Sequence, residues 1–136
     1  MNPTLSNGQG GAFAPHQALA EALLPHATSG DDGSHDIAHL QRVWSNAAAI
    51  LAQEGGNADI VAAATLLHDC VSVEKNDPLR AQASRLAARK AEGVLRALGW
   101  EDARIAAVAH AIEAHSFSAG IVPETLEARI LQDADR

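Results

Sequence analysis

Apolar residues recur every three or four positions along most of the chain, which is the spacing of one face of an α-helix. The pattern is clearest over residues 35–54, where it predicts a long amphipathic helix. The apolar positions of that helix are Ile37, Leu40, Val43, Trp44, Ala47, Ile50 and Leu51. Ser34 is the expected N-cap, because its hydroxyl can accept a hydrogen bond from the first turn. The glycine pair at 55–56 predicts the end of the helix.

The segment that follows is apolar nearly all round rather than on one face. Residues 59–69 contain the run IVAAATLL, and a helix without a polar face is expected in the middle of a bundle. Polar loops are predicted at 71–78 and 116–123. Further helices are predicted over residues 15–26, 79–98, 101–115 and from about 124 onward, with Gly99 as the C-cap that ends the helix over 79–98.

The composition agrees with a helical bundle. Hydrophobic residues make up 47% of the 136 residues, much of that share is alanine, and aromatic residues are only 3%, with no tyrosine. Alanine favours closely packed helices, whereas strands favour β-branched and aromatic side chains. We therefore predict one all-α domain of five or six helices over residues 15–136, after a disordered polar tail over 1–14. The last predicted helix reaches Arg136 without a cap, so we expect the chain to be a fragment of a longer protein.

Charge and cysteine content narrow the class of function. The formal net charge is −7, which argues against a nucleic-acid-binding surface because such surfaces are basic. A small phosphorylated partner stays compatible with this charge, since a bound dication supplies local positive charge. Cys70 is the single cysteine, so no intrachain disulfide can form and a cytoplasmic location is expected. No stretch approaches the roughly 18–20 apolar residues of a membrane span, and no signal peptide is expected.

The chain contains seven histidines, and the most informative is His68, which stands beside Asp69 at the end of the apolar helix. Burying an imidazole and a carboxylate there is costly unless both are satisfied, either as a helix cap or as ligands of a cation. His39 lies on the core-facing side of the preceding helix, where a hydrogen bond to a backbone carbonyl is the simpler interpretation. Asp133 and Asp135 would by themselves be a solvated face.

Taken together, these residues come from different predicted helices and can converge on one cation. Two imidazoles with two carboxylates suit Mn²⁺, Fe²⁺, Co²⁺, Ni²⁺ or Zn²⁺, and suit Mg²⁺ less well. Among these cations we favour Mn²⁺. Asp133 and Asp135 point about 200° apart around a helix, so only one of the two is expected to bind the ion.

The segments HDIAHLQRV, LLHDC and ILQDADR, taken in this order, resemble the metal-binding motifs of HD-domain phosphohydrolases. HSFS together with EARILQDADR further resembles the bacterial branch that acts on nucleotides and releases phosphate or pyrophosphate. The resemblance covers about residues 16–136. It implies an all-α HD domain and one divalent cation held by His39, His68, Asp69 and Asp135. Asp133 then becomes either a hydrogen-bond acceptor behind the ligands or a group that orients water.

The resemblance also implies a mechanism, in which water activated by the cation attacks a phosphorus atom of a nucleotide such as a nucleoside triphosphate. Asp69 or Asp133 would accept the proton. The residues expected to offset charge on the phosphates are Arg42, Lys75 and His115. For Lys75 a solvated loop lysine is the simpler interpretation, and His35, one turn before His39, lies either in the pocket or in solvent.

Other classes of function compete with this one. HDIAH copies the H-x-x-x-H spacing of zincin metalloproteases with Asp in place of Glu, but that interpretation leaves LLHDC and DADR unexplained. An HD-fold module that binds nucleotide without turnover is the stronger alternative, because a fragment would lack part of its pocket. A helical domain without a metal is the remaining one. A homo-oligomer is compatible with the sequence, which does not determine the oligomeric state.

Overall fold

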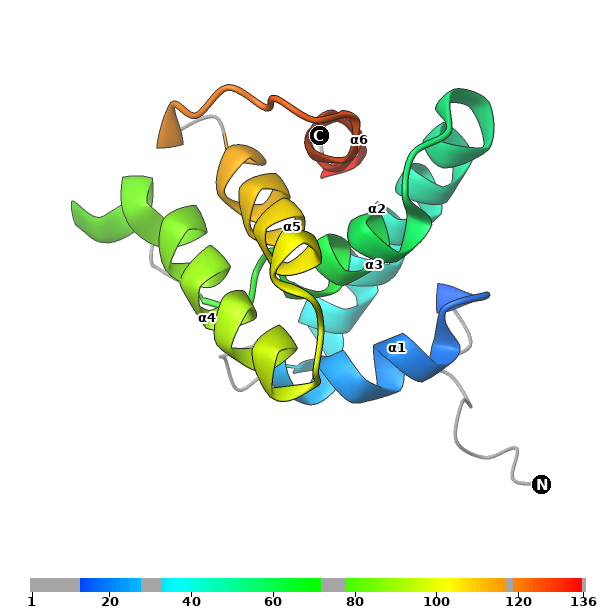
Figure 1. Cartoon of the computed structure of the whole chain (residues 1–136), viewed down its shortest axis with the longest axis horizontal. Coiled ribbons are helices and arrows are strands. Elements are labelled where there is room, and N and C mark those ends of the chain that lie inside the picture. Colours follow the sequence, from blue (N-terminus) through cyan, green and yellow to red (C-terminus); the bar gives the residue numbers. More distant parts are fainter. Residues whose placement is uncertain (1–12, 28–32, 72–77, 117–118, 136) are drawn as a thin grey trace.

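The computed structural model describes residues 13–27, 33–71, 78–116 and 119–135, which form helices and turns with no strand among them (Figure 1). The predicted all-α class is therefore confirmed. The α-helices are α1 (Gln17–Leu23), α2 (Gly33–Glu54), α3 (Ala58–Leu67), α4 (Ala83–Ala97), α5 (Asp102–Ala114) and α6 (Leu126–Asp135). Short 3₁₀ helices, η3 (Leu24–His26) and η4 (Pro78–Gln82), follow α1 and precede α4. Of the expected tail, residues 1–12 lie outside the described part of the chain, whereas Phe13 is buried.

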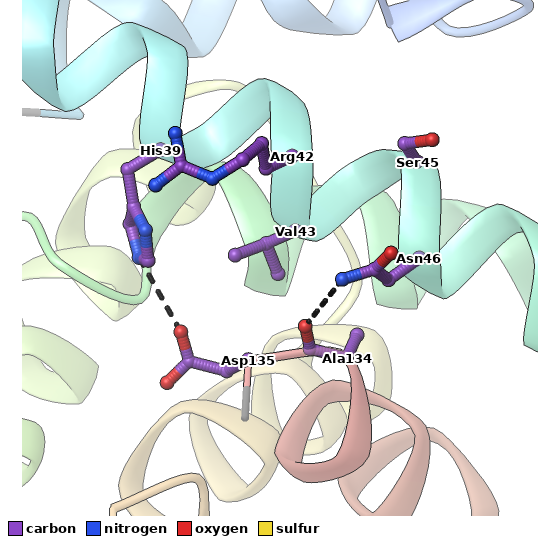
Figure 2. Close-up of a pocket in the computed structure, with 7 residues that line it drawn as sticks. All are labelled: His39, Arg42, Val43, Ser45, Asn46, Ala134 and Asp135. Atoms are coloured by element: carbon purple, nitrogen blue, oxygen red, sulfur yellow. Dashed lines mark hydrogen bonds and ion pairs between the residues drawn. The ribbon is translucent and has the colours of Figure 1, made fainter.

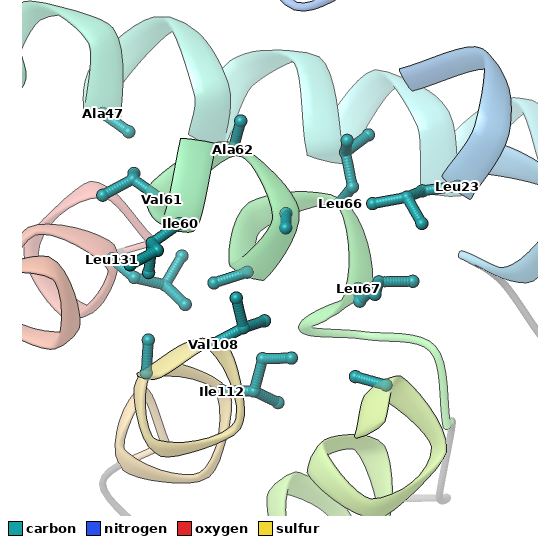
Figure 3. Close-up of a cluster of buried hydrophobic side chains, with 14 of the residues drawn as sticks. Leu23, Ala47, Ile60, Val61, Ala62, Leu66, Leu67, Val108, Ile112 and Leu131 are labelled. Carbon is teal, nitrogen blue, oxygen red and sulfur yellow. The ribbon is translucent and has the colours of Figure 1, made fainter. Parts of the chain in front are cut away.

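Helix α3 forms the centre of the bundle, as its apolar sequence predicts. Every residue from Ile60 to Leu67 is buried, and α1, α2, α5 and α6 pack around them (Figure 1). Ala62, Ala63 and Ala64 carry no bulk beyond Cβ, so the neighbouring helices can approach closely. Side chains that those neighbours contribute to the core include Leu23, Ala47, Val108, Ile112 and Leu131 (Figure 3). Each fully buried leucine stabilises the fold by about 1.5–3 kcal/mol.

Local hydrogen bonds define where α3 begins and where α4 ends. Asn57 is the N-cap of α3, and its Oδ1 accepts a hydrogen bond from the Ile60 N–H at 3.1 Å. Gly99 follows α4 with a φ of +86°, and the Trp100 N–H returns to the Leu95 carbonyl at 3.1 Å. Glycine adopts this left-handed conformation without a steric penalty, so the predicted role of Gly99 in ending the helix is confirmed.

The starts of α2 and α6 are among those that differ from the prediction. Ser34 is not the N-cap of α2, because the helix already begins at Gly33. The prediction placed the start of the helix where the apolar pattern begins. The first turn of a helix requires helical backbone angles but does not require an apolar side chain, so the helix can begin earlier. Helix α6 begins at Leu126 rather than near residue 124, since Thr125 Oγ1 accepts the Ala128 N–H at 3.1 Å and so caps the helix.

The bundle brings the carboxyl ends of three helices to the same side of α2. These are the ends of α3, α5 and α6; α2 packs against α3 and α6, and α5 packs against α3 and α6. A helix carries partial negative charge at its carboxyl end, so this arrangement favours a cation nearby. None of the helices in the described part of the chain is long and apolar enough to cross a membrane.

Candidate metal centre

His68 directly follows the last turn of α3, and its side chain is fully buried. Its Nδ1 lies 2.7 Å from the Thr65 carbonyl oxygen, so the Nδ1–H donates to that carbonyl. A neutral imidazole carries one ring proton, and with the proton on Nδ1 the lone pair is on Nε2. Metal-binding histidines commonly have their tautomer fixed by such a carbonyl. The main chain of α3 therefore leaves Nε2 of His68 available as a ligand atom.

Three other side chains bring a nitrogen or oxygen atom close to His68 Nε2. His39 on α2 places its Nε2 at 3.3 Å. Asp135, the last residue of α6, places Oδ1 3.4 Å from His68 Nε2 and 3.3 Å from His39 Nε2 (Figure 2). Asp69 places Oδ2 at 3.5 Å and 3.4 Å from the same two nitrogens. We refer to His39, His68, Asp69 and Asp135 as the His/Asp cluster.

The geometry of the His/Asp cluster is compatible with metal binding. An imidazole Nε2 has one proton or one lone pair and serves one partner, yet each Nε2 here faces three atoms at 3.3–3.5 Å. Two donors that each lie about 2.1 Å from one ion, at roughly 90–109° to each other, are about 3.0–3.4 Å apart. The donor atoms therefore fit a divalent cation, and His39, His68 and Asp135 lie close enough together to share one.

The electrostatics of the His/Asp cluster favour positive charge. Hydrogen bonds to Asp135 and Asp69 raise the pKa of His39 from 6.5 to about 9. Burial disfavours a charged His68, but the two carboxylates raise its pKa all the same. Burial also opposes ionisation of Asp135 and Asp69, yet the imidazoles hold both carboxyl pKa values below the usual range. The raised imidazole pKa values favour the protonated rings when no cation is bound, so a metal ion and protons would compete for the same atoms.

His115 faces the His/Asp cluster from the end of α5. Its Nδ1–H donates to the Ile112 carbonyl, which leaves the lone pair on Nε2. That Nε2 lies 3.9 Å from Asp135 Oδ2, and the ring meets the His68 ring edge-on with 4.9 Å between centroids. Burial, followed by the charge on His68, lowers the pKa of His115 and favours its neutral form. The residue therefore presents a hydrogen-bond acceptor to the space beside the carboxylate.

A cavity of about 240 Å³ adjoins the His/Asp cluster between α2 and the end of α6 (Figure 2). It is lined by His39, Arg42, Val43, Ser45, Asn46, Ala134 and Asp135. Asn46 Nδ2 donates to the Ala134 carbonyl at 3.1 Å and so ties the two walls together. Arg42 is one of these lining residues and is exposed, so a phosphate that entered the cavity would come near a positively charged side chain.

The remaining residues that the sequence analysis named for the site are Asp133, Lys75 and His35. Asp133 is exposed on α6 and, within the described residues, makes no hydrogen bond or ion pair with the His/Asp cluster. Residues two apart on a helix point about 200° apart, so the phase of α6 that directs Asp135 inward turns Asp133 away. Lys75 lies outside the described residues, and so does the side chain of His35.

The turn that carries Asp69 is held by contacts that the sequence does not predict. The Cys70 N–H donates to the Leu67 carbonyl at 3.1 Å. On α4, the Ala87 carbonyl accepts a hydrogen bond from Cys70 Sγ at 3.4 Å, and Lys90 Nζ donates to the Cys70 carbonyl at 3.1 Å. Burial raises the pKa of the Cys70 thiol to about 11, so the thiol keeps the proton that it donates. The two bonds to α4 arise from tertiary packing, and no residue spacing indicates them.

Comparison with protein-family models identifies the family of the chain. A family model described as HD domain matches residues 36–136 of the chain. That span contains the whole His/Asp cluster together with Arg42 and His115. No curated protein matches the chain.

Proposed function

Because the chain belongs to the HD domain family, whose members are in general metal-dependent phosphohydrolases, we propose that it hydrolyses a phosphate ester or anhydride bond of a nucleotide. The observation that carries the proposal is the convergence of two imidazole nitrogens and two carboxylate oxygens at 3.3–3.5 Å in the His/Asp cluster. The nucleotide class is supported by HSFS and EARILQDADR, the segments that resemble nucleotide-hydrolysing members. Mn²⁺ is the proposed cation, since the donor set mixes nitrogen and oxygen.

A divalent cation bound by the His/Asp cluster would lower the pKa of a water molecule and polarise a phosphoryl oxygen. Within the chain, we assign the proton acceptor to Asp69. Its carboxylate belongs to the cluster, and its side chain is 54% exposed, so solvent reaches it. Asp133, the other carboxylate considered for this step, is exposed on the opposite side of α6 and is the weaker choice.

Arg42 and His115 would act on the substrate and the water in different ways. Arg42 lines the cavity, and its guanidinium would offset negative charge on the phosphates. In a neutral His115, Nε2 is a hydrogen-bond acceptor. A phosphate oxygen is an acceptor too, so the two atoms cannot form a hydrogen bond with each other. We therefore assign His115 to a hydrogen bond from the attacking water or from a substrate hydroxyl. Lys75 stays a proposed phosphate contact on the basis of the sequence resemblance.

The proposal is tested by hydrolysis assays on the purified chain, stripped of metal and then supplied with Mn²⁺, Co²⁺ or Mg²⁺. The substrates are nucleoside triphosphates, nucleoside monophosphates and p-nitrophenyl phosphate. We expect metal-dependent release of phosphate or pyrophosphate from a nucleotide, lost in His68→Ala. The matched control is His26→Ala, which removes an exposed histidine on η3.

Each other outcome identifies the part of the proposal that fails. Nucleotide binding in the presence of metal, without any release of phosphate, would indicate a binding module instead of an enzyme. Hydrolysis of p-nitrophenyl phosphate but of no nucleotide would support phosphohydrolase activity and contradict the proposed nucleotide substrate. If His68→Ala is as active as His26→Ala, the assignment of the active site to the His/Asp cluster is wrong.

A further inference from the structure

Asp69 differs from the rest of the His/Asp cluster in how its backbone is held. His39 and Asp135 lie within α2 and α6, so helical hydrogen bonds fix their backbones. The ring of His68 is fixed by its bond to the Thr65 carbonyl. Asp69 lies past the end of α3, in a turn, and more than half of its side chain is exposed. The position of its carboxylate therefore depends on what holds the turn.

Cys70, the buried residue next to Asp69, is the point at which the turn is attached. Its N–H bonds back to the Leu67 carbonyl, whereas its thiol and its carbonyl both reach α4. The partners on α4 are Ala87 and Lys90, which lie about one turn apart on the same face. A thiol is a weak donor, and a bond from an ammonium group is charge-assisted. The bond from Lys90 at 3.1 Å is therefore the stronger of the two attachments to α4.

We propose that Lys90 is a positioning residue of the metal centre, whose ammonium group fixes the Cys70 carbonyl and thereby keeps the Asp69 carboxylate within reach of the cation. The position of that carbonyl, close to the negative end of α3, also favours a cationic partner. Residues that support metal ligands in this indirect way typically change metal affinity by about 10–100-fold when they are removed. The inference rests on the proposed metal-dependent function, and the wild-type chain tests that function separately.

The experiment uses Co²⁺ as the probe and compares the wild-type chain with Lys90→Met, Lys90→Arg and Arg96→Met. Arg96 lies in the last turn of the same helix and is exposed, so Arg96→Met is the matched control. For each protein, Co²⁺ affinity, the visible absorption spectrum of bound Co²⁺ and the melting temperature without metal are measured. We expect Lys90→Met to bind Co²⁺ about 10–100-fold more weakly and with an altered spectrum. Lys90→Arg should recover part of the affinity, and Arg96→Met should match the wild type.

The outcomes separate a positioning role from a merely structural one. A Lys90→Met protein that melts earlier but keeps the wild-type Co²⁺ affinity and spectrum would overturn the proposal, and so would one identical to the wild type in every respect. If Lys90→Met does not fold, Lys90→Leu removes the donor in a second way, and wild-type Co²⁺ binding by that variant would overturn the proposal as well. A wild-type chain that binds no Co²⁺ would overturn the proposed function first, and this inference with it.

Discussion

At the scale of single residues, His68 and His115 carry their ring protons in the same way but lie at different distances from the carboxylates. His68 and His115 both donate Nδ1–H to a carbonyl three residues earlier, so each leaves Nε2 as an acceptor. His68 Nε2 lies within 3.5 Å of both carboxylates of the His/Asp cluster, whereas His115 Nε2 stands 3.9 Å from Asp135. We therefore expect the two histidines to respond differently to substitution, although their local structures are alike.

Asp135→Asn tests the carboxylate at the end of α6. The amide has nearly the same shape but lacks the negative charge that binds a dication, so we expect metal affinity to fall at least about 100-fold, beyond the usual effect of indirect partners. Asp133→Asn is the matched control on the same helix, and it should bind Mn²⁺ as the wild type does because Asp133 faces away from the cluster. Isothermal titration with Mn²⁺ measures both. Equal losses in the two variants would contradict the assignment of Asp135.

His115→Gln tests the role of His115, which lies beside the His/Asp cluster. Because His115 is assigned to water or substrate and not to the ion, we expect metal content to stay at the wild-type level. Nucleotide turnover should fall on the order of 100-fold, as it does when one positioned hydrogen-bonding group is lost from an active site. Elemental analysis and steady-state kinetics with Mn²⁺ measure the two effects. If the variant loses its metal, His115 is a ligand and the division of roles is wrong.

The sequence predicts the residues of the His/Asp cluster because each of them lies in a short continuous motif, and the motifs follow one another in a fixed order along the chain. The structure brings these four side chains together, and it does not bring Asp133 to them. The bond from Lys90 to the Cys70 carbonyl was not predictable, since it joins residues on different helices through a backbone atom. Backbone carbonyls are present at every position, so their partners leave no mark in the sequence.

At the scale of helices, the carboxyl ends of α3, α5 and α6 meet beside α2, and each of them carries roughly half a negative charge. Apolar spacing predicts these helices because each buries a face or, for α3, its whole circumference. The ends are predicted less well. The segment expected to open a helix at residue 79 forms η4 as far as Gln82. A 3₁₀ turn and an α-helical turn differ by one step in hydrogen bonding, which apolar spacing over a few residues does not resolve.

Gly93 and Gly99, within and just after α4, should respond in opposite directions to replacement by alanine. Gly93 has helical geometry with no atom within 4 Å of an added Cβ, so Gly93→Ala should stabilise the fold by about 0.5–1 kcal/mol. Gly99 has the same open space but a φ of +86°, so Gly99→Ala should destabilise it by about 1–2 kcal/mol. Urea denaturation of the two variants measures both changes. A loss of stability in both would mean that α4 ends differently.

At the scale of the whole molecule, the His/Asp cluster joins segments that are far apart in the sequence. His39 comes from α2, the His68–Asp69 pair from the end of α3, and Asp135 from the end of α6. The unfolded chain cannot present these atoms together, so a cation bound to all of them stabilises only the folded state. The same three segments enclose the site whose chemistry is proposed above, which links metal binding directly to the stability of the bundle.

Metal should therefore raise the melting temperature. With free Mn²⁺ at about 100 times its dissociation constant, the free energy of unfolding should increase by about 2.7 kcal/mol. A chelator should reverse the change. Calorimetry with and without Mn²⁺ measures it, and His68→Ala should show no response to the ion while His26→Ala responds like the wild type. A response of the same size in His68→Ala would show that Mn²⁺ binds elsewhere.

The metal content of the purified chain is the most direct measurement. The wild-type chain and His68→Ala are incubated with Mn²⁺, freed of unbound ion and analysed for metals, with folding of both checked by circular dichroism. We predict close to one divalent ion per wild-type chain and almost none in the folded variant. A wild-type chain without metal after this treatment, or equal metal in the two proteins, would contradict the metal centre on which the proposed function depends.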